Sequence, residues 1–235
     1  SHPTNSTPLD KFLVSHGVPG VCGVDTRAIT RRLRTRGVMA GIISISESPE
    51  NALKRLHKLP SYNSVDFVKQ VSAPSLYRWD KPELGLHESN PKIVVIDYGL
   101  KRNILRLLHS RGCEVIVIPA TTPAQKILNH LPDGVLLSPG PGDPELLDYA
   151  AETTAGLIGR VPIMGICLGH QVLALALGGK TFKLKFGHRG SNHPVRDLST
   201  GLVRITSQNH GYAVDSESLP SEVEVSHLNL NDDTV

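Results

Sequence analysis

The stretch that decides the fold of this chain reads Pro162-Ile163-Met164-Gly165-Ile166-Cys167-Leu168-Gly169-His170-Gln171. The apolar residues 161–166 lead into it, and the leucines and alanines of 173–177 follow as good helix formers. This pattern predicts a strand, a sharp turn and a helix, with Cys167 at the apex. Gly165 and Gly169 provide the small neighbours that such a turn requires. Hydrolases use the same arrangement to present a nucleophile above a sheet.

The position of Cys167 also bears on its reactivity. A helix N-terminus carries partial positive charge, which favours a thiolate over a thiol. Because the thiolate is the competent nucleophile, we expect Cys167 to be an activated catalytic residue. Cys22 and Cys113 lie in plain apolar segments without a following turn and helix, and we expect both to be inert core residues.

Composition limits the class of protein to which this chain can belong. The chain has 235 residues, of which 39% are hydrophobic and 20% charged, as in a folded globular protein. The net charge of +3 is too small to indicate nucleic-acid binding by itself. No apolar run approaches a membrane span, and the three cysteines show no paired spacing. We therefore expect a cytoplasmic protein without nucleic-acid or membrane partners.

A proline-rich, polar and aperiodic segment at 73–91 predicts a linker. It separates a smaller, partial N-terminal domain at 1–72 from a second domain at 92–235. In the first domain, Asp25 is placed to cap a helix over 26–36 whose buried side carries Ile29 and Leu33. Its arginines at 27, 31 and 34 share one face, which fits either a solvated surface or a docking surface for a partner.

After the linker, strands and helices alternate. The predicted strands are 93–96, 115–118, 134–137 and 163–166, and the predicted helices are 101–111, 123–131 and a third that starts at Asp143. Runs rich in β-branched residues that alternate with helices predict a flavodoxin-like α/β fold, with a parallel sheet and helices on both faces. Ligands bind such sheets at the carboxyl ends of strands, where the loop after Leu137 and the turn at Cys167 both lie.

That loop reads Ser138-Pro139-Gly140-Pro141-Gly142-Asp143-Pro144. Its prolines stiffen the chain, while Gly140 and Gly142 keep free N–H groups and carry no side chains. Bare backbone of this kind is suited to approach a ligand or to stabilise an oxyanion. A phosphate-binding loop fits less well, because the prolines remove donors and the Walker pattern is absent.

These two motifs, 138–144 and 165–171, resemble those of class I glutamine amidotransferase domains. Further segments resemble the small, glutamine-hydrolysing subunit of carbamoyl phosphate synthase, and the resemblance runs from about Leu9 to the end of the chain. These segments are 23–27, 97–99, 101–104, 185–195 and 207–215.

The resemblance implies that Cys167 attacks the side-chain amide of glutamine, releases ammonia and forms a thioester. It implies an oxyanion hole from the backbone N–H groups of Gly140 and Leu168. The residues that it implies for glutamine binding are Gly140, Gly142, Leu168, Gln171, Asn209, Gly211 and Tyr212. It further implies that this chain holds no cofactor, that it forms a heterodimer with a large synthetase subunit holding ATP and Mg²⁺, and that the product serves arginine or pyrimidine synthesis.

The chain departs from the family pattern at one point. Family members carry the catalytic histidine and its acid in a His-Pro-Glu motif near the C-terminus, and the 235 residues end at 231–235 without it. We therefore expect a chain truncated at both ends that hydrolyses glutamine poorly by itself. Two other functions stay open: the amidotransferase subunit of another synthase, such as anthranilate synthase, and a non-catalytic partner-binding module.

The histidines at 188, 193 and 210 admit two interpretations. They suggest a zinc site, but their spacing fits no metal motif and no cysteine lies between them. We favour hydrogen bonding within the fold and expect no metal. His170 follows the nucleophile by three residues, and we expect its side chain to point away from Cys167 or to lie beside it.

Overall fold

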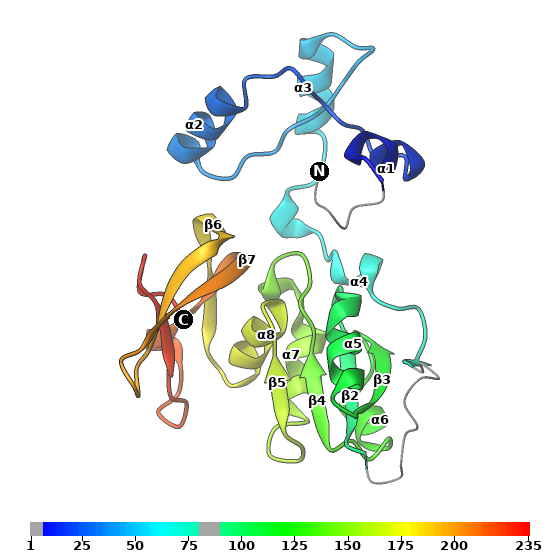
Figure 1. Ribbon diagram of the computed structural model, residues 1–235, viewed down its shortest axis with the longest axis vertical. Coiled ribbons are helices and arrows are strands. Elements are labelled where there is room, and N and C mark those ends of the chain that lie inside the picture. Colours follow the sequence, from blue (N-terminus) through cyan, green and yellow to red (C-terminus); the bar gives the residue numbers. More distant parts are fainter. Residues whose placement is uncertain (1–6, 80–89) are drawn as a thin grey trace. The chain divides into compact units, whose positions relative to one another are not determined.

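The computed structural model describes residues 7–79 and 90–235, which form two compact units, 1–60 and 61–235 (Figure 1). The division falls after Pro60, earlier than the boundary expected at 72. The reason is that Val68 is fully buried in the core of the second unit, and that β1 (Tyr77–Arg78) pairs with one of its strands. Part of the expected linker, 80–89, lies outside the described residues.

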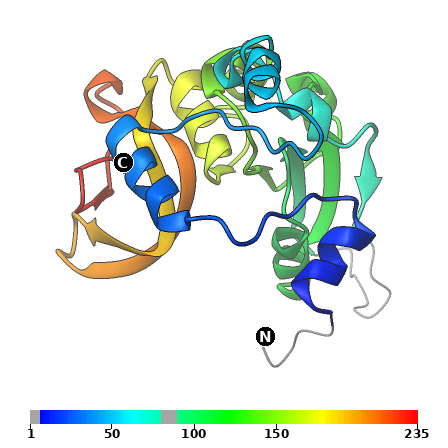
Figure 2. The ribbon, with the colours of Figure 1, turned by 90° about the horizontal axis from the view of Figure 1, so that it is seen from above.

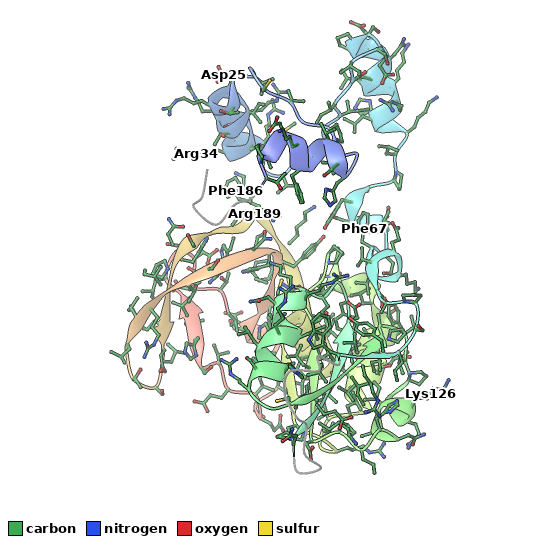
Figure 3. The ribbon with its side chains drawn as sticks, turned by 45° about the vertical axis from the view of Figure 1, so that its right-hand side comes forward. Asp25, Arg34, Phe67, Lys126, Phe186 and Arg189 are labelled. Atoms are coloured by element: carbon green, nitrogen blue, oxygen red, sulfur yellow. The ribbon has the colours of Figure 1, made fainter. Side chains whose placement is uncertain are left out.

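The first unit contains α1 (Leu9–Ser15), α2 (Thr26–Arg36) and α3 (Pro49–His57). As predicted, Asp25 caps α2, accepting from the N–H of Ala28 at 2.9 Å, and Asp25 and Arg34 mark opposite ends of this helix (Figure 3). Ile29 and Leu33 are exposed, so the buried side expected for them is wrong, and Cys22 is exposed as well. In residues 7–60, three short helices without a sheet bury too little apolar area to form a core.

The second unit is built on a five-stranded sheet. Its strands are β1, β2 (Lys92–Asp97), β3 (Glu114–Pro119), β4 (Gly134–Leu137) and β5 (Ile163–Gly165), in the order β1-β3-β2-β4-β5. Strands β2 to β5 run parallel, and β1 adds an antiparallel edge. The sheet confirms the predicted fold class, because fully apolar strands are those that parallel sheets bury on both faces.

Helices cover both faces of the sheet. α5 (Arg102–Ser110) packs on one face, where Leu105 meets Val95 and Val117. The other face carries α6 (Ala124–Leu128), α7 (Asp148–Ala155) and α8 (Leu168–Ala176). The helix predicted at Asp143 starts instead as a 3₁₀ turn, η2 (Pro144–Leu146), before α7. Three further short elements are η1 (Tyr62–Ser64), α4 (Val68–Val71) and η3 (Ser216–Ser218).

A second, antiparallel sheet lies beside α8 and was not predicted. Its long strands β6 (Lys180–Asp197) and β7 (Val203–Asp215) form a curved ribbon, to which β8 (His227–Asn229) adds in the order β7-β6-β8 (Figures 1 and 2). Between η3 and β8 the chain makes a turn after Pro220, and residues 223–226 form neither helix nor strand. α8 contacts both the parallel sheet and the ribbon, so it links the two sheets.

Candidate functional site

The turn at Cys167 has the predicted strand–turn–helix geometry. Cys167 sits between β5 and α8 with φ 54° and ψ −110°, a left-handed conformation that non-glycine residues adopt at a cost of ~1–3 kcal/mol. A Cβ on Gly165 would lie 2.5 Å from the Gly169 carbonyl oxygen, and one on Gly169 would lie 2.2 Å from the Leu137 carbonyl oxygen. Both glycines are therefore needed for α8 to pack directly against the strands.

The thiol of Cys167 is half-buried, and its Sγ donates a hydrogen bond to the Asn209 carbonyl oxygen at 3.7 Å. Burial raises the pKa of this thiol, while the backbone N–H of Leu168 and the positive charges of Lys101 and Arg189 lower it. Burial outweighs the other effects, so the pKa is raised overall. This direction is opposite to the activation expected from the sequence, although the N–H at the start of the helix acts in the expected direction.

The loop after β4 packs on the first residue of α8. A Cβ on Gly140 would lie 2.2 Å from the Tyr98 carbonyl oxygen and 2.7 Å from Cδ2 of Leu168. Gly140 and Leu168, the two residues expected to form an oxyanion hole, are therefore direct neighbours. Gly142 has φ +100°, and its N–H donates to the hydroxyl of Tyr62 at 3.1 Å.

The residues expected to bind glutamine meet near the thiol. Gln171 is 5% exposed, and its Nε2 donates to the Tyr212 carbonyl oxygen at 2.6 Å. Asn209 provides the carbonyl that faces Cys167, and Gly211 lies between Asn209 and Tyr212 along β7. A small cavity of about 60 Å³ adjoins the thiol. Its lining includes Cys167, His170, Gln171, His210, Tyr212 and Val235.

Sequence reasoning missed three residues that contact this group. Asn63 accepts from the Tyr212 hydroxyl at 3.1 Å, and Tyr62 contacts Gly142, although both fall within the range expected for the N-terminal domain. Arg189, on β6 (Figure 3), donates from Nη1 to Oδ1 of Asn209 at 2.8 Å. Arg189 lies within a segment that carries the family resemblance, whereas no sequence signal marks Tyr62 or Asn63.

The three histidines of the ribbon hydrogen bond within the fold, as the favoured interpretation predicted. Nε2 of His188 lies 2.7 Å from Oδ2 of Asp232, and Nδ1 of His210 lies 2.7 Å from the Tyr212 carbonyl oxygen. Across residues 7–79 and 90–235, no group of three or more His, Cys, Asp or Glu side chains has an arrangement that could hold a metal ion. Within the same ranges, no helix is long and apolar enough to cross a bilayer.

Comparison with known proteins places this geometry in context. The family model for class I glutamine amidotransferases matches residues 94–235, and that for the carbamoyl-phosphate synthase small chain, CPSase domain, matches residues 1–43. Two similar relatives are carbamoyl phosphate synthase small chains. The one from Syntrophotalea carbinolica is 48% identical over all of this chain and 65% of its own length. The one from Methanopyrus kandleri is 50% identical over all of this chain and 64% of its own length. The chain thus spans just under two thirds of these relatives.

A solved structure, of a putative GMP synthase protein from Thermoplasma acidophilum, supports the fold. It is 24% identical, covers 61% of this chain and 75% of its own, and superposes with a TM-score of 0.53. The family model over 94–235 covers both the turn at Cys167 and the glycine loop beside it. This chain belongs to the class I glutamine amidotransferase family.

Proposed function

We propose that this chain is the glutamine-hydrolysing part of a carbamoyl phosphate synthase small chain. The observation that carries the proposal is Cys167 in a strained turn, with Gly140 and Leu168 on one side and the segment 209–212 on the other. The relatives named above and the family model over residues 1–43 favour this synthase over anthranilate synthase or another partner enzyme.

In the proposed reaction, Sγ of Cys167 attacks the side-chain amide carbon of glutamine. The N–H groups of Gly140 and Leu168 stabilise the oxyanion of the tetrahedral intermediate. The carbon–nitrogen bond then breaks, and the nitrogen leaves as ammonia with the proton that the thiol gave up. Water cleaves the resulting thioester to glutamate and restores the thiol.

The remaining side chains would hold the substrate. Gln171 already donates to the Tyr212 carbonyl, which leaves its amide oxygen to accept from the α-ammonium group of glutamine. Asn209 is oriented by Arg189, so its amide nitrogen is available as a donor to the substrate. We assign Gly142 and Gly211 backbone contacts, because neither has a side chain that would fill the site.

The thiol needs a proton acceptor, because burial raises its pKa. In the described residues, its hydrogen bond goes to the Asn209 carbonyl oxygen, which cannot act as a base. A positioned general base contributes ~10²–10⁴-fold to such reactions. We therefore expect this chain alone to hydrolyse glutamine slowly, and faster turnover from the full-length protein.

We further propose that the ammonia passes to a large synthetase subunit, which binds ATP and Mg²⁺. The partner would contact the arginine-rich α2, which carries five arginines and no acidic residue in its 11 residues. An acidic surface on the partner would complement this charge.

The test uses the full-length protein with its synthetase partner. Cys167→Ser should abolish glutamine-dependent synthesis of carbamoyl phosphate, while synthesis from added ammonia should persist, because the partner's chemistry needs only ammonia. Cys113→Ser is the matched control and should retain both activities. Loss of both activities in Cys167→Ser would indicate a structural role, and retained glutamine-dependent synthesis would identify a different nucleophile.

A further inference from the structure

A second polar cluster lies within the ribbon, next to the site but outside the proposed chemistry. His188 on β6 is its centre and is only 6% exposed. The titratable groups that face its ring are Asp232, at 2.7 Å from Nε2, His210, at 3.2 Å from Nδ1, and His193, whose ring centroid lies 5.0 Å away. Gln208 and Asn229 complete the cluster.

The two central rings are those of His188 and His210. Their outer nitrogens, Nε2 of His188 and Nδ1 of His210, must each carry a hydrogen. Burial raises the pKa of Asp232, but hydrogen bonds from His188 and Thr234 outweigh it and hold that pKa below its ordinary value. Asp232 is therefore an ionised acceptor, so Nε2 of His188 donates to it. In the same way, Nδ1 of His210 must donate to the Tyr212 carbonyl oxygen at 2.7 Å.

The inner nitrogens are the two that face each other, and in neutral rings neither of them would carry a hydrogen, which leaves a shortage of hydrogens there. Nδ1 of His188 and Nε2 of His210 are 3.2 Å apart, and both lie near Oε1 of Gln208, at 2.9 and 3.0 Å. If both rings were neutral, these three atoms would all be acceptors. Nδ2 of Asn229 lies 3.3 Å from Nδ1 of His188, but a hydrogen given there would leave Nε2 of His210 without a donor.

The orientation of Gln208 does not relieve this shortage. Its Nε2 donates to the Thr206 hydroxyl at 3.2 Å, and that hydroxyl donates in turn to the His193 carbonyl oxygen at 3.0 Å. Because the Thr206 hydroxyl donates its hydrogen to the His193 carbonyl oxygen, it can only accept from the amide nitrogen of Gln208. Asn229 also donates to Oε1 of Gln208, at 3.3 Å. Both contacts keep the amide oxygen of Gln208 turned towards the rings.

One additional proton on Nδ1 of His188 removes this shortage, because that nitrogen then donates to Nε2 of His210 while Asn229 donates to Oε1 of Gln208. We propose that His188 is a doubly protonated imidazolium, held between Asp232 and His210, and that it acts with Asp232 as a positioning residue for the glutamine site. Asp232 provides the counter-charge for the cation at 2.7 Å. His210 is the less suitable carrier, because burial lowers its pKa, and this outweighs the hydrogen bond to the Tyr212 carbonyl, which raises it.

The link to the site is the Tyr212 carbonyl oxygen. It accepts from Nδ1 of His210 and from Nε2 of Gln171, which lies one helical turn after Cys167. A proton on His188 keeps His210 in the tautomer that donates to Tyr212. Without it, the hydrogen of His210 can move to Nε2 to fill the shortage, and the Tyr212 carbonyl loses a donor. The consequence for glutamine rests on the proposed function above.

The protonation state is tested first, by nitrogen NMR of the protein with ¹⁵N-labelled histidine at pH 7. We expect both ring nitrogens of His188 to be protonated, and His210 to be neutral with its hydrogen on Nδ1. His188→Gln assigns the signals, and His227→Gln, an exposed histidine on β8, is the control. An unprotonated nitrogen on His188 at pH 7 overturns the proposal. This measurement does not depend on glutamine.

The positioning role is tested in the full-length protein with Asp232→Asn, which keeps an acceptor for His188 but removes the counter-charge. We expect KM for glutamine to rise about 3–10-fold, the size expected for losing the hydrogen bond from His210 to the Tyr212 carbonyl, with little change in kcat. Asp232→Glu should recover part of the loss. Asp233→Asn is the matched control, because Asp233 is exposed and its φ of 56° suits asparagine.

The two failures are distinguishable. Suppose that the wild-type protein hydrolyses glutamine. The positioning role is then wrong if Asp232→Asn leaves KM unchanged, or if it lowers kcat as well as raising KM. If wild-type protein does not use glutamine at all, the proposed function fails, and the NMR measurement still decides the protonation state of His188.

Discussion

The close contact between α8 and β4 can be tested with Gly169→Ala. Gly169 is the second residue of α8, where alanine would ordinarily stabilise a helix by ~1 kcal/mol relative to glycine. Helix propensity alone therefore predicts a more stable protein. The packing of this residue predicts the opposite, so the sign of the change separates the two effects.

The magnitude follows from the distances. The added Cβ would lie 2.2 Å from the carbonyl oxygen of Leu137, 2.6 Å from its carbonyl carbon and 2.7 Å from its Cβ, whereas ordinary contacts are 3.4–4 Å. Two of these atoms are backbone of β4, so α8 must shift by about 1 Å. Overpacking costs ~1–3 kcal/mol, and the upper part of that range applies here because two of the clashing atoms are backbone. After the ~1 kcal/mol gained in helix propensity, we expect a net loss of ~1–2 kcal/mol. The melting temperature should fall by roughly 2–8 °C.

The same shift displaces the turn at Cys167. Misplacing a catalytic group by about 1 Å can cost ~10²-fold in rate, so glutamine hydrolysis should fall more than stability alone explains. Urea denaturation followed by circular dichroism measures the stability change. Gly134→Ala is the matched control, because its Cβ would mainly meet the flexible end of Ile93 at 3.2 Å. A Gly169→Ala protein as stable as wild type would refute this reasoning.

Two further predictions concern the strand ends near the site. Asp97→Asn should lower the free energy of unfolding by ~1–3 kcal/mol, because the carboxylate accepts from the N–H groups of Gly99, Leu100 and Ala73, and one asparagine NH₂ would face a donor; urea denaturation measures this, and an unchanged midpoint would contradict it. Alkylation of Cys167 by iodoacetamide should speed up as pH rises towards and above 9, because burial raises the pKa of the thiol above its ordinary value of 9.0. Lys101→Met should move this curve of alkylation rate against pH to higher pH, because the charge of Lys101 lowers the pKa of the thiol. Arg106→Met, on the helix that follows, is the control and should leave the curve in place. An unchanged curve in Lys101→Met, or a shift to lower pH, would show that Lys101 does not stabilise the thiolate.

The parallel sheet could be predicted from the sequence because its strands are buried on both faces. Val94, Val95 and Ile96 are fully buried although they point to alternate sides, so the whole run must be apolar. The turn at Cys167 could be predicted for a similar reason, since only glycine fits at 165 and 169.

The ribbon could not be predicted in the same way. Its first strand mixes buried and exposed residues without regular alternation, because the pairing slips between Lys183 and His188 and again between Gly190 and His193. The contacts of Tyr62 and Asn63 were also invisible, since Asn63 and Tyr212 are 149 residues apart. The pKa of Cys167 depends on burial that the sequence does not report.

The lengths of the hydrogen bonds distinguish side chains that are held in place, Gln171 and Asn209, from a contact that a substrate can replace, that of the Cys167 thiol. Gln171 and Asn209 are held by short bonds, of 2.6 Å to the Tyr212 carbonyl and 2.8 Å from Arg189. The contact of the Cys167 thiol with the Asn209 carbonyl is long, at 3.7 Å, and couples a weak donor to its acceptor. A substrate therefore gains by keeping the first two bonds and replacing the third. Under the proposed function, Arg189 and His188 should therefore affect glutamine binding through Asn209 and the Tyr212 carbonyl, without contacting the substrate.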